Sequence, residues 1–138
     1  MRVLPDTSIW VDYLRRGASG PGGELDGLLE RDSVLVCGPV LAELLAGAPP
    51  ERRDELWLAL GSLPWAELDH AAWRQVGELA NDLRRTGTSV ALTDLVIAVA
   101  CVRAEATLWT GDRDFERIRR ALPGLELQLV SGRSSAAD

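Results

Sequence analysis

Apolar positions along the chain follow two spacings that alternate from one end to the other. Short apolar runs bounded by glycine, proline or charged residues predict strands at 2–5, 33–37, 65–68, 106–110 and 125–130. Apolar residues at helical spacing predict helices at 7–16, 24–31, 39–47, 53–60, 71–85, 93–103 (capped by Thr93) and 112–121. The glycine-rich segment 17–23 predicts a mobile loop.

This alternation of strands and helices predicts an α/β fold. Parallel strands need crossover connections, which are usually helical, so we expect a central parallel sheet of about five strands with helices on both faces. That arrangement is a three-layer α/β/α sandwich. The chain has 138 residues and is 46% apolar, which fits one compact domain over 1–131. Residues 132–138 are small and polar and predict a flexible tail.

Composition and charge exclude several classes of function. The net charge of -6 argues against a protein that coats nucleic acid through many phosphate contacts. All 15 basic residues are arginine, which removes the lysine-dependent phosphate loop and every mechanism with a catalytic lysine. Cys37 and Cys101 have no neighbouring cysteine or histidine, so buried reduced thiols are expected instead of a disulfide or a zinc site.

The N-terminal sequence and the apolar runs bear on where the protein acts. No run approaches the roughly 20 apolar residues that span a bilayer, and Asp6 interrupts the N-terminus before a signal-peptide core forms. We therefore expect a cytoplasmic protein without a membrane segment.

Three aspartates stand at the ends of predicted elements. Asp6 ends the first strand, Asp112 follows the strand that ends at Thr110, and Asp94 begins a helix. In open α/β sheets the ligand crevice lies beyond the carboxyl ends of the strands, so Asp6 and Asp112 are expected to reach it. The position of Asp94 depends on how the preceding loop folds. Each aspartate also has an ordinary use as a cap or turn residue, worth about 0.5 to 1 kcal/mol.

Glu43 lies in a predicted helix with apolar neighbours on every side, in the run VLAELLA. A carboxylate buried among such neighbours needs a cation, a metal or a proton. Arg52 or Arg53 is one possible partner, and a metal shared with the aspartates is the other.

Carboxylates without histidine or cysteine ligands suit a hard cation such as Mg²⁺ or Mn²⁺. Such an ion at an acidic site supports hydrolysis of phosphodiester bonds, because it activates water and offsets the charge that develops on phosphate. His70, the only histidine, is remote in sequence from the acids and is not expected to be catalytic.

Four sequence blocks carry a resemblance to a known family. They are LPDTSIWVDYLR at 4–15, LAELLAG at 41–47, TDLVIAVA at 93–100 and TGDRDF at 110–115. Each block contains one of the acids described above, and all four occur in the family's order. In these blocks the chain resembles PIN-domain toxins of the VapC kind over nearly its whole length.

The resemblance implies a function and a site. It implies a Mg²⁺- or Mn²⁺-dependent endoribonuclease, the toxin of a type II toxin-antitoxin system. Asp6, Glu43, Asp94 and Asp112 would form the catalytic metal pocket, with Asp6 and Asp94 as the foremost ligands and Asp114 as a secondary one. Candidates for positioning water or phosphate through a hydroxyl are Thr7, Ser8 and Thr110, with capping and turn formation as the equally favoured alternative. Arg15 and Arg113 are candidates for contacting the substrate.

The resemblance also implies a topology and partners. The sheet order would be 3-2-1-4-5, as in a fold similar to that of flap nucleases. The partners would be an RNA substrate, a VapB-type antitoxin whose tail occupies the substrate groove, and a second copy of the chain in a homodimer.

Other functions remain open at this point. A phosphoacceptor receiver domain or a haloacid-dehalogenase phosphatase would need a lysine that this chain lacks. A catalytically silent binding module with the same fold, or a nuclease that cuts single-stranded DNA, is the main alternative.

Two groups of residues have competing interpretations. Charged residues at helix ends are usually just solvated, but some arginines are candidates for steering RNA phosphates. These are Arg15, Arg16, Arg84, Arg85 and Arg113. Trp57, Leu58 and Trp65 are candidates for lining an antitoxin groove, with core packing as the preferred interpretation.

Overall fold

A parallel three-stranded sheet forms the centre of the protein. The structure is a computed structural model that describes residues 2–130, so the tail predicted at 132–138 lies outside the described residues. The strands β1 (Val3–Pro5), β2 (Thr107–Thr110) and β3 (Glu126–Leu129) pair in the order β1-β2-β3. Both ladders are parallel, as predicted, and leave the carboxyl ends of β1 and β2 at the same edge of the sheet.

The prediction of five strands is wrong for two segments. Residues 33–37 and 65–68 form only isolated parallel bridges, Val3 with Val34 and Val36 with Trp65. The first segment lies between the left-handed turn at Asp32 and the helix that starts at Gly38, and it exchanges only two backbone hydrogen bonds with β1, both through Val3. The bridges nevertheless place 33–37 beside β1, on the side away from β2, and 65–68 beyond 33–37, in the implied order.

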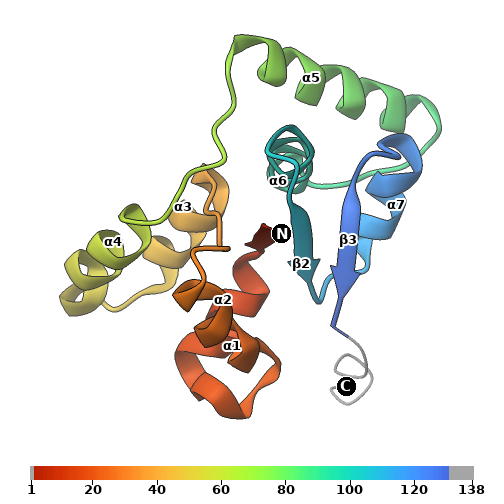
Figure 1. Cartoon of the computed structure of the whole chain (residues 1–138). Coiled ribbons are helices and arrows are strands. Elements are labelled where there is room, and N and C mark those ends of the chain that lie inside the picture. Colours follow the sequence, from red (N-terminus) through yellow and green to blue (C-terminus); the bar gives the residue numbers. More distant parts are fainter. Residues whose placement is uncertain (1, 131–138) are drawn as a thin grey trace.

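Seven α-helices surround this sheet in residues 2–130. They are α1 (Thr7–Arg16), α2 (Leu25–Glu30), α3 (Gly38–Gly47), α4 (Arg53–Gly61), α5 (His70–Arg85), α6 (Leu92–Arg103) and α7 (Asp114–Ala121). Figure 1 shows α1 to α4 gathered on the β1 side, with α5 to α7 around β2 and β3. The arrangement is consistent with the predicted α/β sandwich.

Two local predictions need correction. The expected loop at 17–23 contains two 3-10 turns, η1 (Gly17–Ser19) and η2 (Pro21–Glu24), and a third turn, η3 (Pro50–Arg52), precedes α4. The backbone N–H of Gly22 donates to Asp12 on α1, which ties the second turn to that helix. Thr93 does not cap α6, because the helix already begins at Leu92.

The core is centred on α6, which is buried from Leu95 through Cys101. This burial fixes the start of α6, and with it Asp94, against the sheet. Cys37 and Cys101 are buried free thiols, as predicted. Within residues 2–130 no helix is long and apolar enough to cross a membrane.

Two side chains on α4 are more exposed than the sequence predicted. Trp57 is 51% exposed and Leu58 is 70% exposed, so core packing was the wrong prediction for both side chains. Trp65 is partly buried and packs against the core, as preferred. The apolar outer face of α4 is therefore available for contact with another molecule.

Candidate metal centre

Asp6 is held by protein donors at the junction of β1 and α1. It is 6% exposed and caps α1: Oδ1 accepts from the Ser8 backbone N–H at 3.0 Å, the Ser8 hydroxyl at 2.6 Å and the Ile9 N–H at 3.3 Å. Oδ2 accepts a hydrogen bond from the Thr110 hydroxyl. Asp6 therefore both caps α1 and lies at the edge of the sheet where β1 ends.

Thr110 links Asp6 to the second strand end. Its side chain is fully buried at the end of β2, where the hydroxyl donates to Asp6 and accepts from the backbone N–H of Asp112 at 2.9 Å. One hydroxyl therefore sets the relative positions of two of the predicted site acids.

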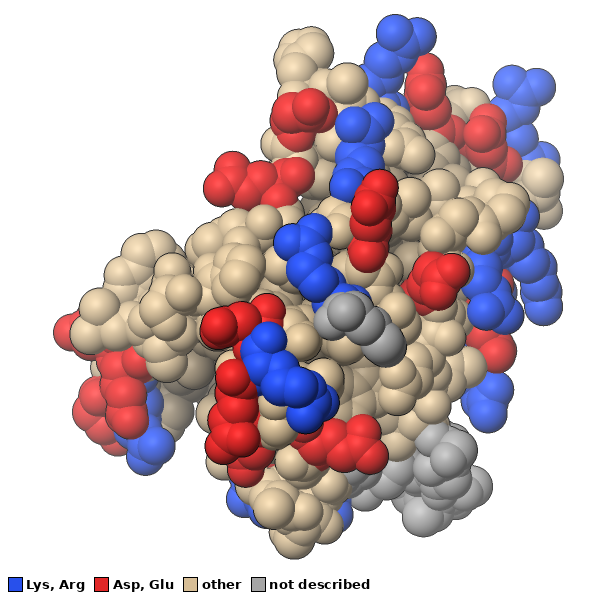
Figure 2. Space-filling model, viewed as in Figure 1, with Lys and Arg blue, Asp and Glu red and all other residues tan. Residues whose placement is uncertain are grey.

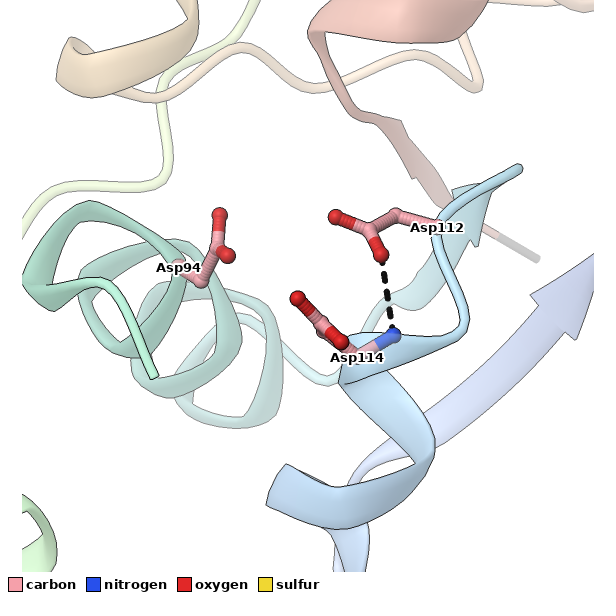
Figure 3. A group of neighbouring side chains, drawn as sticks. All are labelled: Asp94, Asp112 and Asp114. Carbon is pink, nitrogen blue, oxygen red and sulfur yellow. Dashed lines mark hydrogen bonds between the residues drawn. The ribbon is translucent and has the colours of Figure 1, made fainter. Parts of the chain in front are cut away.

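Three aspartates from different elements lie together. One carboxylate oxygen from each of Asp94, Asp112 and Asp114 lies within 4.8 Å of the others. Figure 3 shows Asp94 on α6 facing Asp112 and Asp114 across the gap between α6 and the start of α7. Asp112 also accepts a hydrogen bond from the Asp114 backbone N–H at 2.9 Å, which fixes the turn into α7. The helix α7 starts at Asp114, with Arg113 at the N-cap position, and therefore two residues later than predicted.

Glu43 differs from the prediction that it is buried. It is exposed on α3, and its Oε1 accepts a hydrogen bond from the Thr7 hydroxyl. The arginines considered as its partners are engaged elsewhere: Arg52 pairs with Glu55 at 3.4 Å, and Arg53 donates to the Pro50 carbonyl at 3.5 Å. The apolar neighbours of Glu43 in the sequence therefore do not place its side chain in an apolar environment.

The acids influence one another electrostatically. Burial, which has the largest effect, and the nearby charges of Asp112, Asp114, Glu43 and Asp6, in that order of importance, together raise the pKa of Asp94 to about 6. Burial also raises the pKa of Asp6, although the hydrogen bonds that it accepts oppose the change. The charges of four neighbouring carboxylates act on Asp94 without a cation to balance them, and a divalent cation with oxygen ligands would supply the positive charge.

The remaining predicted site residues have defined contacts. Thr7, Ser8 and Thr110 use their hydroxyls to hold Glu43 and Asp6, so their structural role is clear. Arg113 pairs with Glu116 at 3.5 Å. Arg15 is exposed and lines a groove that also reaches Glu43.

Arg117 was missed by the sequence analysis. Its Nη2 donates to Asp114 Oδ1 at 3.1 Å and to the backbone carbonyl of Ser89 at 3.3 Å. Arg117 thereby connects helix α7 with the loop that precedes α6, beside the three aspartates. The spacing of three residues from Asp114 was the available signal, since such pairs lie on one face of a helix.

The raised pKa of Asp94 predicts how stability depends on pH without metal. Between 3.8 and about 6 the folded protein holds a proton on Asp94 that the unfolded chain has lost. Stability from this group is therefore highest at low pH and falls as pH rises through that window. In EDTA we expect Asp94→Asn to have a higher Tm than the wild type at about pH 7, with the difference shrinking at about pH 4.

Thermal unfolding of both proteins over this pH range measures the effect. Acid titration of other carboxylates affects both proteins alike. The difference between their Tm values therefore reports the protonation of Asp94. A difference that stays constant with pH would contradict the assigned shift.

The chain is similar to known proteins over most of its length. Residues 3–121 match the family described as PIN domain. VapC ribonuclease Mb1587 of Mycobacterium bovis is 31% identical over 123 residues, which cover 86% of this chain and 92% of that protein. Ribonuclease VapC11 of Mycobacterium tuberculosis matches to the same extent.

Solved structures show the same likeness. In the crystal structure of VapBC2 from Rickettsia felis bound to a promoter DNA fragment, the matched chain is 25% identical with a TM-score of 0.71, covering 94% of this chain and 98% of that one. In the DNA-bound VapBC of Salmonella typhimurium, the match is 22% identical with a TM-score of 0.74, covering 93% and 97%.

Proposed function

This chain belongs to the PIN-domain family, and on that premise we propose that it is a metal-dependent endoribonuclease, the toxin of a type II toxin-antitoxin pair, acting in the cytoplasm. The observation that carries the proposal is the group of carboxylates from Asp94, Asp112 and Asp114 within 4.8 Å of one another. The names of its relatives as VapC ribonucleases support RNA as the substrate class.

The proposed ligands of Mg²⁺ or Mn²⁺ are these three aspartates, with Asp6 and Glu43 completing the site. When bound, such an ion offsets charge on phosphate oxygens and lowers the pKa of water. The side chains of the protein position the acids. Asp6 is fixed by its four donors, and the Thr7 hydroxyl orients Glu43.

The charge state of Asp94 limits the conditions for activity. Its pKa of about 6 means that it is ionised at neutral pH even without a metal. A ligating carboxylate must be deprotonated, so metal binding is expected to weaken as the pH falls below that value.

Cleavage of total cellular RNA by the purified chain, with Mg²⁺ and with EDTA, tests the proposed activity. Discrete fragments that require the metal support an endoribonuclease. A parallel reaction on single-stranded DNA tests the alternative nuclease, since nothing in the site identifies a contact with a ribose 2′-hydroxyl. Metal binding without cleavage of either polymer would favour a silent binding module.

A groove that reaches Glu43 suits the antitoxin. It has a volume of about 500 Å³, lies between α1, α3 and α4, and includes Glu43. Its apolar wall is formed by Val11, Leu14, Leu44 and Leu56, with Arg15, Arg52 and Glu55 as charged residues of the lining. An amphipathic segment of a VapB-type antitoxin would bury its apolar side here and block access to the acids. In the proposed assembly, two copies of the chain form a homodimer that binds the antitoxin.

Leu14→Glu tests this groove. Leu14 is 53% exposed, so the charge is tolerated in the free toxin, whereas burying it under a partner is costly. We expect binding to the cognate antitoxin to weaken by roughly 30-fold or more, as at an interface hot spot, with RNA cleavage retained. Titration of the purified toxin with antitoxin measures this. Trp73→Glu on α5, equally exposed but outside the groove, is the control, and equal losses in both variants would refute the assignment.

A further inference from the structure

Four arginines at the ends of α5 and α7 are not explained by the site described above. Arg84 and Arg85 form the last turn of α5, and Arg119 and Arg120 lie in the last turn of α7. All four side chains are exposed. We call these four residues the arginine flank.

The two helix ends that carry the arginine flank lie on the same edge of the molecule. The helices α5 and α7 pack against each other, and Arg117 of α7 bonds to the carbonyl of Ser89, just beyond the end of α5. Figure 1 shows the end of α5 above α7, and Figure 2 shows basic side chains gathered along that edge. The flank is therefore one surface built from two segments distant in sequence.

Most other arginines have a defined partner. Arg16, Arg52, Arg74, Arg103, Arg113 and Arg117 each pair with a carboxylate. Within residues 2–130, by contrast, no carboxylate lies within ion-pair distance of any flank arginine, Asp82 on α5 included. Basic residues favour helix C-termini, but this preference does not explain why four unpaired charges share one edge of an acidic protein.

Arg117 joins the arginine flank to the acids. It lies one turn before the end of α7 and contacts Asp114 at 3.1 Å. At a rise of about 1.5 Å per residue, the last turn of α7 lies about 9 Å along the helix from Asp114. A polyanion bound along the flank would therefore be close to the carboxylate group.

We propose that the arginine flank binds the phosphate backbone of single-stranded RNA and leads it to the acids. This inference rests on the proposed ribonuclease function and names a binding surface for its substrate. The acidic site repels phosphate until a cation is bound, so a separate cationic surface supplies the attraction that brings RNA to it. Arginine is well suited to this contact because its guanidinium group binds phosphate through paired hydrogen bonds.

The test measures binding of a short fluorescent single-stranded RNA to the full chain carrying Asp94→Asn, which prevents cleavage. Into this parent we place Arg84→Gln with Arg85→Gln, or Arg119→Gln with Arg120→Gln. Each pair is expected to weaken binding about tenfold and to lower the slope of log affinity against log salt concentration by roughly 0.7 per lost phosphate contact. The corresponding double lysine variants keep the charge and are expected to retain most of the salt slope.

The matched control is Arg74→Gln at the other end of α5, where the arginine is exposed and paired with Glu78 at 2.9 Å. It is expected to leave the affinity and the salt slope unchanged. In the otherwise wild-type chain, the flank variants are expected to raise KM for RNA with kcat retained. Thermal unfolding verifies that each variant is folded.

The possible outcomes test the RNA-binding role of the arginine flank and the proposed ribonuclease function separately. If the wild type cleaves RNA while the flank variants bind and cleave as Arg74→Gln does, the flank proposal is wrong and the ribonuclease assignment stands. If the wild type cleaves nothing but RNA binding depends on the flank, the binding surface is supported and the catalytic assignment fails. Loss of antitoxin binding with unchanged RNA binding would show that the flank recognises an acidic polypeptide, which overturns the proposal.

Discussion

Asp94→Asn is expected to lower RNA cleavage by roughly a thousandfold or more. The substitution keeps the volume of the side chain but removes one of the three carboxylates that lie within 4.8 Å of one another. The remaining acids have less negative charge with which to hold a divalent ion. The same change relieves repulsion between Asp94 and its acidic neighbours, so the variant should fold at least as stably as the wild type in EDTA.

Initial rates of cleavage on one RNA oligonucleotide, with enzyme in excess, measure this effect. Asp82→Asn, an exposed acid on α5 outside the site, removes the same charge and serves as the control. Full activity of Asp94→Asn at saturating Mg²⁺ would show that Asp94 is not part of the metal site. If Asp94→Asn is less stable than the wild type in EDTA, the argument that the substitution relieves repulsion between carboxylates is wrong.

Thr110→Val is expected to have the second largest effect, because it affects both stability and activity. The change removes a fully buried hydroxyl and leaves Oδ2 of Asp6 without its donor and the Asp112 N–H without an acceptor. Unsatisfied buried groups of this kind cost about 1 to 3 kcal/mol each, and more when charged. We expect the free energy of unfolding to fall by about 2 to 4 kcal/mol and cleavage to fall by about 10- to 100-fold, as for residues that orient metal ligands.

Urea unfolding and cleavage rates of the same preparations measure the two effects. Thr107→Val makes the same substitution on the same strand, at a partly buried position outside the Asp6 network, and should be nearly neutral. Thr110→Ser keeps the hydroxyl and should recover most of the activity. If Thr110→Val resembles Thr107→Val in both assays, the link between Asp6 and Asp112 is unimportant.

The sequence predicted much of this arrangement, because parallel strands bring their carboxyl ends to one edge. Asp6 and Asp112 each follow a strand, and the register of β1 with β2 places these strand ends side by side. The blocks around Glu43 and Asp94 supplied the other acids through resemblance to the family. Residues 33–37 and 65–68 look like strands because most of their apolar residues are buried, yet burial does not require a continuous ladder.

Other features depend on contacts between distant segments. Glu43 has apolar neighbours in sequence, but its side chain points to an exposed position beside Thr7, which only the packing of α3 against α1 determines. Arg117 could not be assigned to the site without knowing that the loop at Ser89 returns to α7. Asp114 was a secondary candidate, and its place beside Asp94 follows from where α7 begins.

Calorimetric titration of the metal-free protein with Mn²⁺ at neutral pH, on the wild type and Asp94→Asn, tests the central claim most directly. The account predicts saturable binding to the wild type that is lost or greatly weakened in the variant, and that weakens in the wild type below about pH 6 as Asp94 takes up a proton. Equal binding by the two proteins, or no binding by the wild type, would contradict a metal centre formed by these aspartates.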